Sequence, residues 1–79
     1  MQSFILYGTS ACHLCERAEA LLAALLDPAQ HQIELVDISE EDVLVERYGM
    51  RIPVLLREAD RVELGWPFDA EQAKTFLKG

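Results

Sequence analysis

Two cysteines separated by two residues, Cys12 and Cys15, have the type and spacing for redox chemistry. A thiolate attacks disulfides, and a second thiol three positions along a helix lies on the same face and can reach the first sulfur. A bridge between them closes so small a loop that it adds little stability. We expect Cys12 to be the nucleophile, because unpaired N–H groups at a helix start favour its thiolate, and Cys15 to be the resolving thiol.

Two other interpretations of this pair are a metal or cluster site and two inert buried thiols. Zinc takes about four ligands, and besides the cysteines the chain offers only His13, beside the nucleophile, and His31. We therefore expect no metal bound within one chain, since a dimer would complete the ligand set more readily. The position at a helix start argues against inert thiols.

His13 directly follows Cys12, and its effect on the nucleophile is open. A cationic imidazole there would favour the neighbouring thiolate. The alternative is an exposed residue in the first turn of a helix, with little effect on Cys12.

Apolar periodicity places the cysteine pair between a strand and a helix. Residues 3–7 form an apolar run that ends at Gly8, which predicts a strand covered on both faces. Residues 11–26 are predicted to form a helix that stops before Pro28. Its inward stripe is predicted to consist of Leu14, Ala18, Leu21, Leu22 and Leu25.

The rest of the chain predicts two more helices and three more strands. Residues 32–38 read as a strand, and residues 39–42 resemble a capping box that starts a short helix ending at Gly49. Residues 54–56 and 62–64 form a hairpin, and Asp69 caps a last helix. That helix is predicted to face inward with Ala73, Phe76 and Leu77. The order β-α-β-α-β-β-α indicates an α/β domain, with the first two strands parallel because a helix joins them.

Composition excludes several classes of protein. The 79 residues suffice for one domain, 1–79, and 51% hydrophobic with 27% charged residues is typical of a globular chain. The longest apolar run, residues 20–26, is too short to span a membrane, and a net charge of −7 argues against nucleic acid or anionic lipid as partners. Residues 27–49 carry seven acids and one arginine, which we interpret as a solvated surface. No signal peptide is recognisable, so we expect a cytoplasmic protein. We also expect it to be a monomer.

The order of the elements, with a Cys-x-x-Cys pair after the first strand and at the start of the first long helix, resembles that of the thioredoxin fold. The short chain is similar to glutaredoxins over essentially all its residues. The resemblance rests on residues 7–15, 48–55 and 65–69, which read YGTSACHLC, YGMRIPVL and GWPFD. The third segment, with its Trp-Pro-Phe stretch, is similar to a subfamily of small glutaredoxin-like proteins of poorly defined function.

The resemblance implies a substrate-binding role for Ile52 and Pro53. In thioredoxin-fold redox proteins the proline at this place is cis and faces the cysteines, and the backbone of the preceding residue pairs with the substrate main chain. The alternative is an ordinary trans proline at the start of a strand.

The expected glutathione site departs from the family pattern. Residues 9–11 contain no Lys or Arg, and Trp66 stands near the place where glutaredoxins have paired glycines. Arg51 is a candidate replacement for the missing cation, although an exposed loop arginine is the more common situation. Asp69 reads as a helix cap rather than a ligand for an amino group, and Trp66 reads more readily as a core residue than as part of a docking surface.

Together these features predict a glutaredoxin-like thiol–disulfide oxidoreductase that serves cell redox homeostasis. Cys12 and Cys15 would be catalytic, and the predicted substrate-binding residues are His13, Arg51, Ile52, Pro53 and Trp66. Its partners would be a disulfide-containing protein or a glutathione mixed disulfide, with no prosthetic group required and glutathione as a candidate reductant. The alternative is a binding module that uses this fold without turnover to hold a metal, a cluster or a protein partner.

Overall fold

The computed structural model describes residues 1–10 and 12–78. The elements follow the predicted order, with one additional 3₁₀ turn, η1. They are β1 (Gln2–Gly8), α1 (His13–Leu25), β2 (His31–Asp37), η1 (Ile38–Glu40), α2 (Asp42–Tyr48), β3 (Val54–Arg57), β4 (Val62–Gly65) and α3 (Ala70–Lys78).

The four strands form one mixed sheet in the order β2-β1-β3-β4. β1 pairs in parallel with β2, while β3 is antiparallel to both β1 and β4. The register sets Gly8 opposite Asp37 on one side of β1 and Tyr7 opposite Val54 on the other. The carboxyl end of β1, which leads into the cysteines, therefore lies beside the start of β3.

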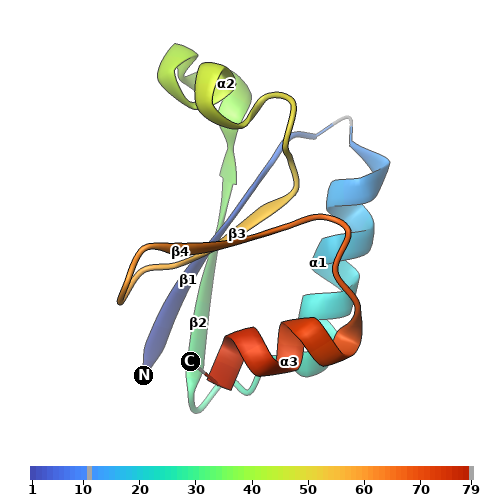
Figure 1. The fold of residues 1–79 in the computed structure, drawn as a ribbon, viewed down its shortest axis with the longest axis vertical. Helices are drawn as coiled ribbons and strands as arrows, with labels where there is room; N and C mark the ends of the chain where they lie inside the picture. Colours follow the sequence, from blue (N-terminus) through green and yellow to red (C-terminus); the bar gives the residue numbers. More distant parts are fainter. Residues whose placement is uncertain (11, 79) are drawn as a thin grey trace.

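Each face of the sheet packs against different helices, because side chains alternate along a strand. Phe4, Leu6 and Leu55 point to the face covered by α1 and α3. Tyr7 and Val54 point to the other face, where η1 and α2 pack. In Figure 1, α1 and α3 lie together beside the sheet, and α2 stands apart near the end of β2. Both faces of β1 are thus covered, as the apolar run at residues 3–7 predicts.

The predicted inward stripe of α1 is wrong at its first residue. Leu14 is exposed, whereas Cys15, Ala18 and Leu22 are buried. Cys15 occupies the inward position of the first turn, and Leu14, one residue and about 100° away around the helix, is turned outward. The helix starts at His13; Ala11, where the sequence suggested its beginning, lies outside the described residues.

The predicted capping box at residues 39–42 is also wrong. Ser39 donates both its backbone N–H, at 2.9 Å, and its hydroxyl, at 2.7 Å, to Asp37 Oδ1. Ser39 is therefore part of η1 and does not cap α2. The N-cap residue of α2 is Glu41, which makes no side-chain capping bond. The predicted end of α2 at Gly49 is correct.

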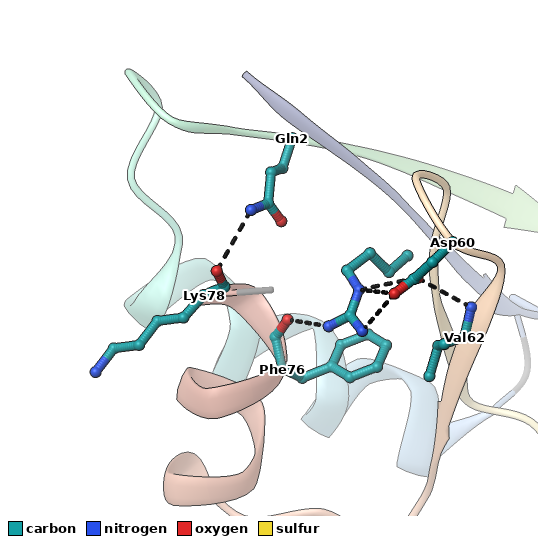
Figure 2. Close-up of polar contacts among 6 residues, drawn as sticks. Gln2, Asp60, Val62, Phe76 and Lys78 are labelled. Carbon is teal, nitrogen blue, oxygen red and sulfur yellow. Dashed lines mark hydrogen bonds and ion pairs between the residues drawn. The ribbon is translucent and has the colours of Figure 1, made fainter.

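Two polar contacts fasten the hairpin and α3 at the end of the sheet remote from the cysteines. Arg57 pairs with Asp60 at 2.8 Å in the β3–β4 turn and donates a 2.8 Å hydrogen bond to the Phe76 carbonyl oxygen in α3 (Figure 2).

The start of α3 is capped reciprocally. The Asp69 side chain accepts a hydrogen bond from the backbone N–H of Gln72, and the Gln72 side chain accepts one from the backbone N–H of Asp69, which confirms Asp69 as the cap.

Candidate active site

The cysteine pair forms a disulfide at the N-terminus of α1, with the Cα atoms 5.2 Å apart. Cys12 is the N-cap residue, and its sulfur accepts a 3.1 Å hydrogen bond from the backbone N–H of Cys15. Cys12 is half-buried, whereas Cys15 is only 7% exposed. The more accessible cysteine is thus the one at the helix start, which is the arrangement a nucleophile and a resolving thiol require.

Gly8 at the end of β1 brings the sheet into contact with Cys15. A Cβ atom at this position would lie 2.9 Å from the Cys15 sulfur and 3.1 Å from its Cβ, closer than side-chain atoms normally approach. The absence of a side chain at Gly8 therefore allows the first turn of α1 to pack directly on the strand.

Pro53 lies beside this contact. Because Tyr7 pairs with Val54, the next residues, Gly8 and Pro53, are neighbours at the edge of the described register. Pro53 is buried, and its peptide bond with Ile52 is cis, as the resemblance implies. The structure therefore places the cis-proline near the cysteines through Gly8, which contacts Cys15, although the two motifs are well separated in sequence.

The backbone of the cis-proline segment is already partly engaged. Ile52 donates its N–H to the Tyr48 carbonyl oxygen at 3.0 Å, and Trp66 donates its N–H to the Pro53 carbonyl oxygen at 3.1 Å. The Ile52 N–H is therefore already engaged within the protein.

A polar cluster of Tyr48, Arg51 and Glu63 holds this segment in place. The Tyr48 hydroxyl donates a 2.6 Å hydrogen bond to Glu63 Oε2, and Arg51 Nη2 lies 2.7 Å from Glu63 Oε1. Arg51 also stacks over the Tyr48 ring at 5.4 Å. The hydrogen bond from Tyr48 and then the one from Arg51 hold the pKa of Glu63 below its ordinary value, so the carboxylate is charged at neutral pH.

Tyr48 is the buried centre of this cluster. Its ring is 3% exposed and stacks on Tyr7 with 4.3 Å between ring centroids. Burial, together with the hydrogen bond to Glu63, raises the pKa of Tyr48 to about 12. Sequence reasoning missed Glu63, whose partners lie 12 and 15 residues away.

Two other predicted site residues lie at the margins. Trp66 is half-buried, packs edge-on against Phe68 at 5.1 Å and joins the core beneath α1 and α3. His13 is 97% exposed at its side chain, with Nδ1 3.6 Å from Glu16 Oε2. These contacts favour the core interpretation of Trp66 and leave the imidazole of His13 facing solvent.

A hollow of about 230 Å³ adjoins Cys15 on the side of β2. Thr9, Glu19 and Asp37 contribute polar groups to its wall. Hydrogen bonds from the Ser39 side chain and then its backbone hold the pKa of Asp37 below its ordinary value. This acidic wall was not anticipated, because only strand pairing brings Asp37 next to Gly8.

Across residues 1–10 and 12–78, no cluster of three or more His, Cys, Asp or Glu side chains is arranged to hold a metal ion. In the same residues no helix has the length and apolar character to cross a membrane.

Comparison with known proteins agrees with the geometry. A family model described as "Glutaredoxin-like domain (DUF836)" matches residues 3–78. The chain belongs to this glutaredoxin-like family. No curated protein matches it.

Solved structures support the same assignment. The crystal structure of XcR50 from X. campestris is 35% identical, with a TM-score of 0.82 over 95% of both chains. The solution structure of the same protein gives 0.80 over 99% of this chain and 94% of that one. Protein Ne2328 from Nitrosomonas europaea is 28% identical, with a TM-score of 0.78 over 95% of this chain and 89% of that one. The α/β fold is thus the thioredoxin-like fold of a glutaredoxin-like protein.

Proposed function

We propose that this protein is a thiol–disulfide oxidoreductase of the dithiol type. The observation that carries the proposal is the Cys12–Cys15 disulfide, which joins the more accessible cysteine at a helix N-terminus to a buried cysteine that packs against Gly8. A purely structural bridge over two intervening residues would add little stability. A pair that can open and close beside a cis-proline is instead suited to exchange.

In the proposed reaction, the Cys12 thiolate attacks one sulfur of a substrate disulfide. The substrate S–S bond breaks, a mixed disulfide with Cys12 forms, and the first substrate thiolate leaves and takes up a proton. The Cys15 thiol then loses its proton and attacks the Cys12 sulfur, which releases the second substrate thiol. Two electrons pass from the protein dithiol to the substrate, and the protein returns to the disulfide form.

Pro53 and Ile52 would orient the substrate, with the Ile52 carbonyl oxygen accepting a hydrogen bond from its main chain. We expect the chemistry to need no prosthetic group, because the electrons reside in the two thiols. A dithiol or glutathione would restore the reduced state. The substrate would be a disulfide-containing protein or a mixed disulfide.

A redox titration with thiol alkylation tests the proposal. The protein is equilibrated in glutathione buffers between about −150 and −350 mV, quenched, and its free thiols are counted by mass. We expect a single two-electron transition. If the two cysteines form no mutual disulfide anywhere in this range, the protein is a binding module instead.

Matched single-cysteine variants assign the roles. Cys15→Ser should retain a reactive Cys12 and accumulate stable mixed disulfides with substrates, because nothing resolves them. Cys12→Ser should trap little, because Cys15 is buried. The reverse pattern would show that the roles are exchanged.

A further inference from the structure

The cation nearest the cis-proline in sequence is neutralised within the protein. Arg51 stands two residues before Pro53, with its side chain 49% exposed, and it is paired to Glu63 at 2.7 Å. Arg51 directly precedes the Ile52–Pro53 segment that the proposed function assigns to substrate binding, whereas Glu63 reaches it from β4, where it lies opposite Leu56. Any substrate carboxylate that approached Arg51 would have to compete with Glu63.

Glu63 is poorly able to yield its position. Its second oxygen accepts the 2.6 Å hydrogen bond from Tyr48, whose ring is buried. Swinging the carboxylate outward would leave the Tyr48 hydroxyl unpaired in a buried place, which is costly. The Glu63 side chain is 21% exposed, so its charge also acts on molecules at the surface.

We propose that Glu63 determines the substrate class of this site: by holding Arg51, it removes the cation that would otherwise favour disulfides that carry carboxylates. The proposal rests on the proposed function and gives it a substrate class, namely disulfides whose binding needs no carboxylate contact with Arg51. A glutathione moiety, with its two carboxylates, then gains no advantage from this cation.

The test uses three small disulfides of different charge on the reduced protein. They are cystamine, which is dicationic, bis(2-hydroxyethyl) disulfide, which is neutral, and dithiodiglycolate, which is dianionic. The rate at which each converts Cys12 and Cys15 to their disulfide is measured by acid quench and alkylation. Each rate is divided by that of dithiothreitol with the same compound to remove its intrinsic reactivity. On this scale, the wild type should react with the dianion no faster than with the neutral compound or the dication.

Glu63→Gln should raise the dianion rate relative to the neutral one by about three- to sevenfold. This is the range expected when the charge of Arg51 is no longer compensated and acts on a nearby substrate carboxylate through a medium close to water in dielectric constant. The glutamine carbonyl oxygen can still accept the Tyr48 hydrogen bond, so the cluster is retained. Glu58→Gln is the matched control, since it changes net charge equally in the β3–β4 turn, at the end of the sheet remote from the cysteines, and makes no contact with Arg51 among the described residues; it should leave the ratio unchanged.

Arg51→Gln provides a second variant that keeps the Tyr48–Glu63 bond. It should slow the dianion relative to the neutral compound, because Glu63 is then uncompensated. The double variant Arg51→Gln/Glu63→Gln should return the ratio close to that of the wild type. Arg47, whose guanidinium lies 5.6 Å from the Tyr48 ring centroid, is the other cation at this cluster. Each arginine substitution is combined with Glu63→Gln. If Arg47→Gln, and not Arg51→Gln, abolishes the rise in the dianion rate relative to the neutral rate, the assignment to Arg51 is wrong.

The failures of the two proposals are distinguishable. If none of the three compounds oxidises the dithiol, the oxidoreductase function fails and the substrate class fails with it. If all three react but Glu63→Gln shifts the charge ranking no more than Glu58→Gln, only the inference about Glu63 is overturned.

Discussion

Replacing Tyr48 with phenylalanine removes the hydroxyl at the centre of the cluster that holds the cis-proline segment. The ring and its stacking on Tyr7 remain, and only the 2.6 Å hydrogen bond to Glu63 is lost. Hydrogen bonds to charged groups contribute about 1.5–3 kcal/mol. Since Glu63 keeps Arg51 as a partner and is partly exposed, we expect a loss near the lower end, about 1.5 kcal/mol of unfolding free energy at pH 7.

The same bond should make this loss depend on pH. Burial, and then the hydrogen bond to Glu63, raises the pKa of Tyr48 from 10.0 to about 12 in the folded state. A raised pKa gives stability that is complete below the unfolded value and is lost as the pH rises through the folded value. At pH 11 the unfolded tyrosine is ionised and the folded one is not, which costs the wild type about 1.4 kcal/mol that the Phe variant does not lose. The gap between the two proteins should therefore shrink from about 1.5 kcal/mol at pH 7 to near zero at pH 11.

Urea denaturation of the oxidised proteins at pH 7 and pH 11 measures this gap. Trp66, the single tryptophan, reports unfolding by fluorescence. Tyr7→Phe is the matched control, because the Tyr7 hydroxyl makes no hydrogen bond among the described residues, and it should cost less than Tyr48→Phe at pH 7. A Tyr48→Phe gap that is equally large at both pH values would refute the reasoning.

Two further predictions concern the surroundings of the cysteines. Gly8→Ala should cost about 1–3 kcal/mol of unfolding free energy, because its methyl group would lie 2.9 Å from the Cys15 sulfur. Gly65→Ala, whose methyl meets nothing within 4 Å, should stay within about 0.5 kcal/mol of the wild type, and equal costs in urea denaturation would contradict the packing of α1 on β1. His13→Ala should shift the reaction of Cys12 with iodoacetamide to higher pH, because an imidazole that can stabilise the neighbouring thiolate is lost. Unchanged reactivity from about pH 5 to 9 would remove His13 from the mechanism.

The elements were predictable where local pattern alone decides them. The apolar run at residues 3–7, the stop before Pro28 and the Asp69 cap all act over a few residues, and each is found in the structure. The two errors arose where a local signal had a competitor. Cys15, not Leu14, takes the inward position of the first turn of α1. Ser39 is bonded to Asp37 within η1, so the N-cap position of α2 falls to Glu41.

The candidate site was predictable in its cysteines and in the cis form of Pro53, which a motif carries. Its electrostatics were not, because Glu63 meets Tyr48 and Arg51 only after β3 and β4 pair. No periodicity or spacing in one sequence encodes a contact that depends on the register of a hairpin.

The position of Glu63 also changes how the acidity of the chain bears on function. Residues 27–49 carry the excess of acids, whereas residues 50–79 hold five acids and five bases and therefore have no net charge. Glu63 belongs to that balanced part, and its charge is compensated by Arg51 at 2.7 Å. A substrate beside Pro53 would therefore meet a closed ion pair rather than a free cation. Salt largely screens the interaction between exposed charges that are more than about 8–10 Å apart. The Arg51–Glu63 pair therefore acts on a nearby ligand more specifically than the net charge of the protein does. Substrate selection by charge should thus persist at physiological ionic strength, and its loss there would attribute the selection to the diffuse acidity of residues 27–49 instead.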